Sequence, residues 1–216
     1  EENNYVGVFE TAIKALEDMG LTSAALGFDD TRFADALGDT LKKATVRDAT
    51  NLLFEIRMVK TPAEIDILRI SAKKNQAAME KAFKAIHANA TWGEVVTAYE
   101  VGVAEEGGRV LAAFNGAGRK SAGAGRINKN YPILEGEQIC FDSMMRWKRY
   151  MGDCQRTVIL GQASDKLERY WRGYKAGVDE VYGSMKPGLS TGDLRNQAIE
   201  LVRNNGCPTF ELAFIH

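Results

Sequence analysis

Residues 138–158 constrain the fold of this chain most strongly, because two β-prone runs meet there at a polar turn. We expect the two runs to pair as an antiparallel hairpin that reverses near Trp147 and Lys148. This reversal would place Asp142 directly opposite Asp153, and the two-residue alternation of a strand would keep both side chains on one face. The same face would carry Cys140, Met144, Met151 and Gln155.

Two carboxylates opposed across a strand pair destabilise it unless a cation, a shared proton or full solvation compensates their charges. One interpretation places Asp142 and Asp153 on a wet surface. Arg146, Lys148 or Arg149 would then neutralise them. The other interpretation is a divalent metal site, which the apolar side chains on the same face favour because they indicate a half-buried position.

The composition is that of an ordinary globular protein: the 216 residues are 45% hydrophobic and 26% charged, with a formal net charge of −1. No basic block and no run of 18 apolar residues occurs, so the sequence predicts neither a nucleic-acid nor a membrane partner. The three cysteines show no CxxC spacing. This pattern fits a reducing compartment, so we expect a cytoplasmic protein without a thiolate zinc cluster.

The helix and strand patterns divide the chain in two. Residues 1–56 alternate helix and strand patterns, as in the C-terminal part of an α/β domain. The next segment begins with a helix start, in which Thr61 caps, Pro62 takes the first helical position and Glu64 completes a capping box. Further helices are predicted after residues 91, 165 and 190, and Thr91 with Glu94 repeats the capping-box pattern at the start of the first of these. The helix after residue 165 carries an apolar stripe that we expect to face the core. The stripe comprises Leu167, Trp171, Tyr174, Val178, Val181 and Met185.

A loop rich in glycine and cations covers residues 115–126. It lacks the GKS or GKT ending of a P-loop, so we do not interpret it as a phosphate cradle. We expect a loop beside a pocket, where Arg119 and Arg126 are available to hold an anionic group such as a substrate carboxylate. Histidine is scarce: only His87 and His216 occur. His87 lies beside a helical apolar stripe and is interpreted as a structural residue.

Several segments in this order and spacing resemble the creatinase, prolidase and methionine aminopeptidase family, known for the pita-bread fold. The resemblance covers about residues 57–216 and is closest in layout to the Xaa-Pro peptidases. It implies an α+β pita-bread catalytic core that is incomplete at its C-terminus and follows part of an α/β N-terminal domain in residues 1–56, so we expect the natural chain to be longer at both ends. The matching segments are residues 57–65, 134–142, 150–157 with Gly161, and 186–188 with the helix after them.

In that family two Asp, one His and two Glu hold a pair of divalent ions. The resemblance therefore implies Asp142 and Asp153 as two metal ligands and His216 as the third. The alternative alignment makes His216 a neighbouring active-site histidine that precedes the ligand. Both glutamates would follow residue 216. Manganese, cobalt, zinc or iron would suit such ligands, and the family suggests a homodimer. No catalytic side chain is assigned.

The function that the resemblance implies is hydrolysis of the Xaa-Pro aminopeptidase or dipeptidase type, in which two metal ions polarise the carbonyl and activate a water. The substrate would be a small peptide or another small molecule. One departure matters: the peptidases carry a histidine in the loop before the first Asp strand, and no histidine lies between His87 and His216 here. Two alternatives stay open. One is a creatinase-like, ectoine hydrolase-like or lyase-like enzyme for a small zwitterion, and the other is a catalytically dead binding module.

Overall fold

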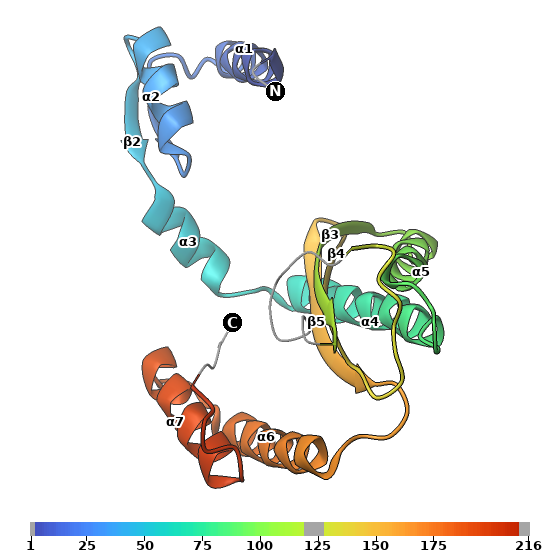
Figure 1. The fold of residues 1–216 in the computed structure, drawn as a ribbon. Coiled ribbons are helices and arrows are strands. Elements are labelled where there is room, and N and C mark those ends of the chain that lie inside the picture. Colours follow the sequence, from blue (N-terminus) through green and yellow to red (C-terminus); the bar gives the residue numbers. More distant parts are fainter. Residues whose placement is uncertain (1–2, 119–127, 212–216) are drawn as a thin grey trace. The chain divides into compact units, whose positions relative to one another are not determined.

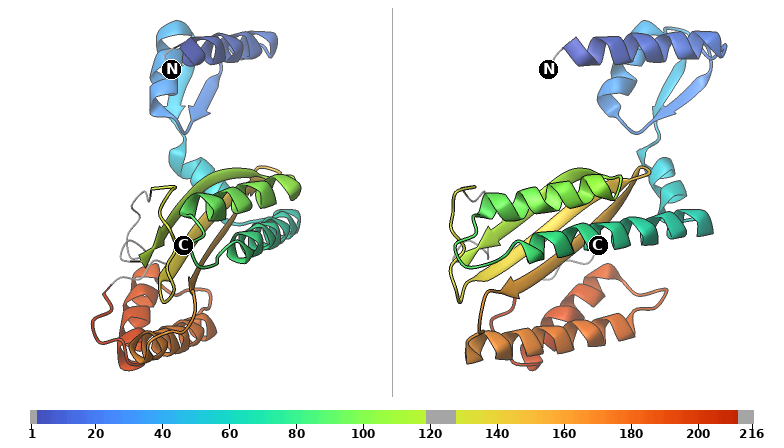
Figure 2. Two further views of the ribbon diagram at one scale, coloured as in Figure 1. Left: turned by 45° about the vertical axis from the view of Figure 1, so that its right-hand side comes forward. Right: turned by 90° about the vertical axis from the view of Figure 1, so that its right-hand side faces the viewer.

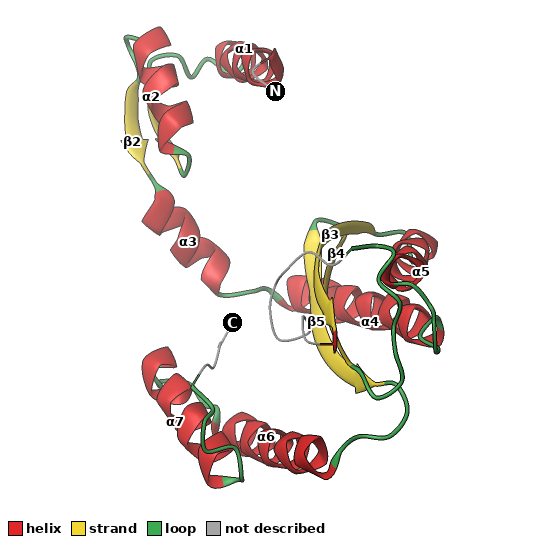
Figure 3. Ribbon diagram, in the orientation of Figure 1, coloured by secondary structure: helices red, strands yellow, loops and turns green. Residues whose placement is uncertain are grey.

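The computed structural model describes residues 3–118 and 128–211, and Figure 3 shows their helices and strands. The chain forms two compact units, Glu1–Asp66 and Ile67–His216. Helices and strands are both present, and the strands of the second unit pair antiparallel, in line with the predicted α+β class. The domain boundary between residues 56 and 57 stays a prediction. Among the described residues, no helix is both long enough and apolar enough to cross a bilayer.

In the first unit two short parallel strands pair, and the helix that connects them packs against both (Figure 1). Leu37 is completely buried, and the Phe33 ring contacts the rings of Phe9 and Phe28 at centroid distances of 5.6 and 5.7 Å. The helix over residues 50–58 was not predicted. The elements of this unit are α1 (Asn3–Asp18), β1 (Ala25–Phe28), α2 (Thr31–Thr40), β2 (Thr45–Asp48) and α3 (Thr50–Met58).

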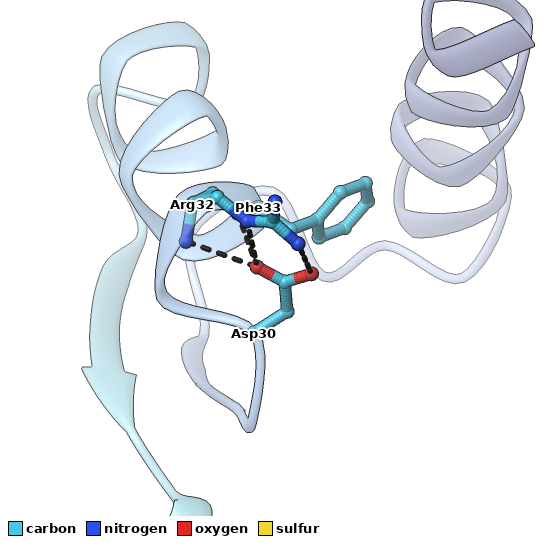
Figure 4. Close-up of polar contacts among 3 residues, drawn as sticks. All are labelled: Asp30, Arg32 and Phe33. Atoms are coloured by element: carbon cyan, nitrogen blue, oxygen red, sulfur yellow. Dashed lines mark hydrogen bonds and ion pairs between the residues drawn. The ribbon is translucent and has the colours of Figure 1, made fainter. Parts of the chain in front are cut away.

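Asp30 caps the N-terminus of α2 (Figure 4). Its carboxylate accepts the backbone N–H groups of Arg32 and Phe33 at 3.0 and 3.3 Å, and it also accepts from the Arg32 guanidinium. The Arg32 contact and these backbone donors stabilise the charged form, so the pKa of Asp30 is lowered. A side-chain acceptor of this kind satisfies backbone donors that a helix start leaves unpaired.

The second unit packs two helices on one face of a three-stranded antiparallel sheet, as Figure 2 shows. The strand order is β3-β4-β5. Phe141, in the middle strand, is fully buried, and its ring contacts Phe83 of α4 and Trp92 and Tyr99 of α5. The elements are α4 (Pro62–Lys84), α5 (Trp92–Glu105), β3 (Arg109–Ala117), β4 (Gln138–Trp147), β5 (Tyr150–Ile159), α6 (Asp165–Ser184) and α7 (Thr191–Asn204).

Both predicted capping boxes are present. Thr61 and Glu64 exchange hydrogen bonds at the start of α4, where the Thr61 N–H donates to the Glu64 carboxylate at 2.7 Å and the Glu64 N–H donates to the Thr61 hydroxyl at 3.3 Å. Thr91 and Glu94 form the same arrangement at the start of α5. These signals are local, so sequence alone places both helix starts correctly.

Helices α6 and α7 form a hairpin whose contact face matches the predicted one only in part. Gly173, Gly177 and Val181 of α6 are buried, and a Cβ on Gly177 would lie 2.7 Å from a methyl carbon of Val202 in α7. The predicted apolar stripe takes part in this contact at Val181, which is buried, while Gly173 and Gly177 beside the stripe allow the closest helix approach. Within the described part of the chain the stripe residues Trp171, Tyr174 and Met185 are 59%, 49% and 40% exposed.

A glycine in β5 sets how closely α4 approaches the sheet. Gly152 is buried, and a Cβ there would collide with the Ser71 backbone carbonyl and lie 2.7 Å from its carbon. We expect Gly152→Ala to lower the unfolding free energy by about 1–3 kcal/mol, because overpacking a rigid contact forces the backbone apart. Urea denaturation would measure the change.

Gly183→Ala is the matched control for this prediction. Gly183 lies in α6, and a Cβ added there would meet nothing within 4 Å. The same added methyl group should therefore stabilise the protein by roughly 0.5–1 kcal/mol through helix propensity. Equal effects of the two substitutions would contradict the close packing of α4 on Gly152.

Candidate metal centre

The turn of the β4–β5 hairpin lies one residue later than predicted. Trp147 pairs with Tyr150, so Lys148 and Arg149 are the two loop residues. Both have positive φ, 47° and 72°. Two successive positive φ values are typical of the type I′ turn, whose twist matches that of the flanking strands. The usual Asn-Gly or Asp-Gly signal is absent, which explains why the sequence misplaces the turn.

The later turn changes the register, so the predicted direct opposition of the two carboxylates is wrong. Asp142 pairs with Gln155, and Asp153 pairs with Met144. Moving the turn by one residue shifts the pairing by two, and a two-residue shift leaves every side chain on its original face. Asp142 and Asp153 therefore share one face as diagonal neighbours. Such neighbours are about 7–8 Å apart between their backbones, a span that two carboxylates can bridge through a shared cation.

The shared face is only partly shielded. Asp142 is half-buried and Asp153 is exposed. Gln155 donates from Nε2 to the Cys140 sulfur at 3.1 Å, and Met151 is 54% exposed. Lys148, one of the cations proposed to neutralise the carboxylates, lies over the Trp147 ring with its Nζ 4.8 Å from the ring centroid. This cation therefore has an aromatic contact of its own.

The donor set fits part of a divalent metal site. Two carboxylates project from the same face of paired strands, and hard oxygen donors suit Mg²⁺-like and Mn²⁺-like ions. Within residues 3–118 and 128–211, no group of three or more His, Cys, Asp or Glu side chains comes together around one point. His216, Arg119 and Arg126 lie outside the described residues. Of the predicted site residues, the structure therefore describes Asp142 and Asp153.

Sequence reasoning missed a buried polar network on the opposite face of the hairpin. Asn75 of α4, Tyr99 of α5 and Ser143 of β4 are each 0% exposed. The Tyr99 hydroxyl donates to Asn75 Oδ1 at 2.7 Å, and Asn75 Nδ2 donates to the Ser143 carbonyl at 2.8 Å. The spacing of Ser71 and Asn75, four residues apart on the buried face of α4, is the signal that could have revealed it.

Comparison with known proteins identifies the family. The model of metallopeptidase family M24 matches residues 66–216, which include the whole β4–β5 hairpin. The chain belongs to metallopeptidase family M24. The family and the pita-bread fold expected from the sequence are both confirmed. M24 enzymes are metal-dependent, and membership of this hydrolase and peptidase family supports an enzyme.

The relatives span more than one named activity. A Xaa-Pro dipeptidase of Lactobacillus delbrueckii subsp. lactis is 24% identical over 205 residues, covering 94% of this chain and 53% of the relative. An ectoine hydrolase of Halomonas elongata is 26% identical over 167 residues, covering 71% of this chain and 41% of the relative. The chain therefore spans about half the length of the curated relatives that it matches.

The solved structures support the fold. The crystal structure of an X-Pro aminopeptidase from Thermotoga maritima superposes with a TM-score of 0.77 at 19% identity, covering 92% of this chain and 57% of that chain. At this identity the likeness concerns the architecture alone.

The buried position of Tyr99 in this network predicts how the unfolding free energy depends on pH. Burial raises the pKa of Tyr99 to about 12. An unfolded tyrosine titrates near ~10, so between these values the folded state keeps a proton that the unfolded state loses. This contribution to stability is complete below about pH 10 and is lost as the pH rises toward 12, by roughly 1.4 kcal/mol per pH unit.

In Tyr99→Phe this loss is absent. The unfolding free energy of the variant should therefore fall less steeply than that of the parent at alkaline pH. Urea titrations of both proteins at about pH 9 and about pH 11 measure the two slopes. Parallel slopes would contradict the assignment of a buried, protonated phenol.

Proposed function

We propose that this M24 chain belongs to a metal-dependent hydrolase of the Xaa-Pro aminopeptidase or dipeptidase type. The observation that carries the proposal is the placement of Asp142 and Asp153 as diagonal neighbours on one face of paired strands, within a chain that matches the metallopeptidase family model. The relative named Xaa-Pro dipeptidase supports this substrate class.

Each candidate residue has a role in this proposal. Asp142 and Asp153 would hold the metal through hard oxygen donors, and their strands would fix the direction of both carboxylates. His216 would be the third ligand, or the neighbouring active-site histidine that precedes it. When bound, a pair of manganese, cobalt, zinc or iron ions supplies Lewis-acid polarisation of the scissile carbonyl and an activated water. Arg119 or Arg126 would orient the carboxylate of the substrate.

The cellular setting is part of the same proposal. We propose a cytoplasmic homodimer that acts on small peptides. The absence of CxxC spacing supports a reducing compartment, and dimerisation rests on the family resemblance alone.

Metal binding is the first test. The parent protein should bind Mn²⁺, and both Asp142→Asn and Asp153→Asn should abolish binding, because each replaces a charged ligand by a neutral amide of the same shape. Isothermal titration calorimetry would measure the dissociation constants.

Asp179→Asn is the matched control. This carboxylate lies on α6 and forms an exposed ion pair with Lys175 at 2.6 Å, so its loss should leave Mn²⁺ binding unchanged. Asp142→Asn and Asp153→Asn variants that bind Mn²⁺ as tightly as Asp179→Asn would refute the proposed centre and favour the catalytically dead binding module.

The second candidate is a non-peptidase M24 enzyme that acts on a small zwitterion. Two observations favour it: no histidine lies between His87 and His216, and an ectoine hydrolase is among the relatives. Assays with a panel of Xaa-Pro dipeptides and with ectoine and creatine separate the two candidates. We expect cleavage of at least one dipeptide that depends on Asp142 and Asp153. Turnover of a zwitterion alone would establish the second candidate in its place.

A further inference from the structure

The two candidate metal ligands are each followed by a residue that points the opposite way. Ser143 follows Asp142, Cys154 follows Asp153, and Ser143 and Cys154 are direct partners across the strand pair. Since neighbouring side chains of a strand alternate, the Ser143–Cys154 pair faces α4 and α5 while the carboxylates face the other side. Any group that fixes the backbone at this pair therefore acts directly behind both carboxylates.

A buried hydrogen-bonded network fixes the backbone at this pair. Asn75 Nδ2 donates to the Ser143 carbonyl at 2.8 Å. The Ser143 hydroxyl lies 3.3 Å from the Cys154 carbonyl and 3.5 Å from Asn75 Oδ1, so one donor is shared between the two strands and the helix. Tyr99 completes the arrangement by donating to Asn75 Oδ1 at 2.7 Å. Asn75 thereby connects α4, α5 and β4, and the Ser143 hydroxyl extends the network to β5.

Burying the polar groups of Asn75, Tyr99 and Ser143 costs free energy, which indicates that this network has a role besides packing. A buried polar group costs free energy unless it is paired, and an apolar residue at position 75 would fill the same volume without that requirement. A fully satisfied network, by contrast, gives one defined geometry. Here the defined geometry concerns the peptide groups next to Asp142 and Asp153, which set the direction and separation of the two carboxylates.

We propose that Asn75, oriented by Tyr99, is a positioning residue for the Asp142–Asp153 metal centre and acts through the backbone of Ser143 and Cys154. This inference rests on the proposed function, because it assumes that the carboxylates hold a metal. Asn75 touches neither the ion nor the substrate. Groups that hydrogen-bond a metal ligand from behind typically contribute roughly ten-fold to hundred-fold to metal affinity. Asn75 acts through the neighbouring peptide group, so we expect an effect at the lower end of this range.

The fold offers a matched control one helical turn earlier. Ser71 is also fully buried on α4, and its hydroxyl donates to the Tyr150 carbonyl of the same hairpin at 3.1 Å. That bond fixes the strand beside the turn, not beside either carboxylate. If the polar groups of α4 only attach the helix to the sheet, loss of Ser71 and loss of Asn75 should have the same consequences for metal binding.

The experiment compares Asn75→Leu, Tyr99→Phe and Ser71→Ala with the parent by Mn²⁺ calorimetry and by amide hydrogen exchange of the metal-free protein. We expect Asn75→Leu to weaken Mn²⁺ binding about ten-fold or more. Tyr99→Phe should cause a smaller loss, and Ser71→Ala should leave the affinity unchanged. In the absence of metal, exchange should accelerate at residues 142–144 and 153–155 in Asn75→Leu, and near Tyr150 in Ser71→Ala.

Each outcome decides the proposal. Unchanged Mn²⁺ affinity in folded Asn75→Leu, or an equal loss in Ser71→Ala, would overturn it. If Asn75→Leu does not fold, the near-isosteric Tyr99→Phe provides the same comparison. If the parent binds no Mn²⁺, the exchange data alone decide whether Asn75 holds the strands, and unchanged exchange at residues 142–144 and 153–155 in Asn75→Leu would overturn the proposal.

Discussion

The close approach of α4 to the β4–β5 hairpin is the contact on which the rest of the second unit depends. Gly152 has no side chain to keep the helix away, so the Ser71 backbone lies against the strand. At this separation Asn75 reaches the Ser143 carbonyl, and Phe141 packs between α4 and α5. One face of the hairpin is thereby filled by helix, which leaves the opposite face for the carboxylates. The packing that stabilises the sheet therefore also determines which face of the hairpin is left uncovered by helices for the two carboxylates.

The register of the hairpin shows which part of the site the sequence determines. Alternation alone places Asp142 and Asp153 on one face, because the side-chain period of a strand is two. Their pairing depends on the turn, and Lys148 and Arg149 give no local sign that both adopt positive φ. Misplacing the turn by one residue shifts the pairing by two, so the error changes the partner of each carboxylate and preserves its face. The metal hypothesis consequently survives a wrong register.

Other features were predictable to the extent that their causes are local. The capping boxes at Thr61 and Thr91 follow from residues three positions apart, and both are present. The apolar stripe predicted the contact face of α6 only in part: Val181 is buried, but Gly173 and Gly177, which have no apolar side chain to reveal them, form the rest of that face. The Asn75 network joins residues separated by 24 and 68 positions, and no short-range pattern encodes such contacts. Arg119, Arg126 and His216 lie outside the described residues and stay predictions.

The hairpin explains metal-dependent chemistry better than it explains substrate choice. In the proposed function, two carboxylates on paired strands would define where a cation binds, and that requirement would be the same whether the bond to be cleaved belongs to a peptide or to a small zwitterion. Relatives named Xaa-Pro dipeptidase and ectoine hydrolase align with this chain at similar identity, so family membership alone does not distinguish the two substrate classes. Selectivity must therefore come from side chains that contact the substrate beyond the metal. Arg119 and Arg126, which we propose to bind the carboxylate of the substrate, are the first such candidates in this chain.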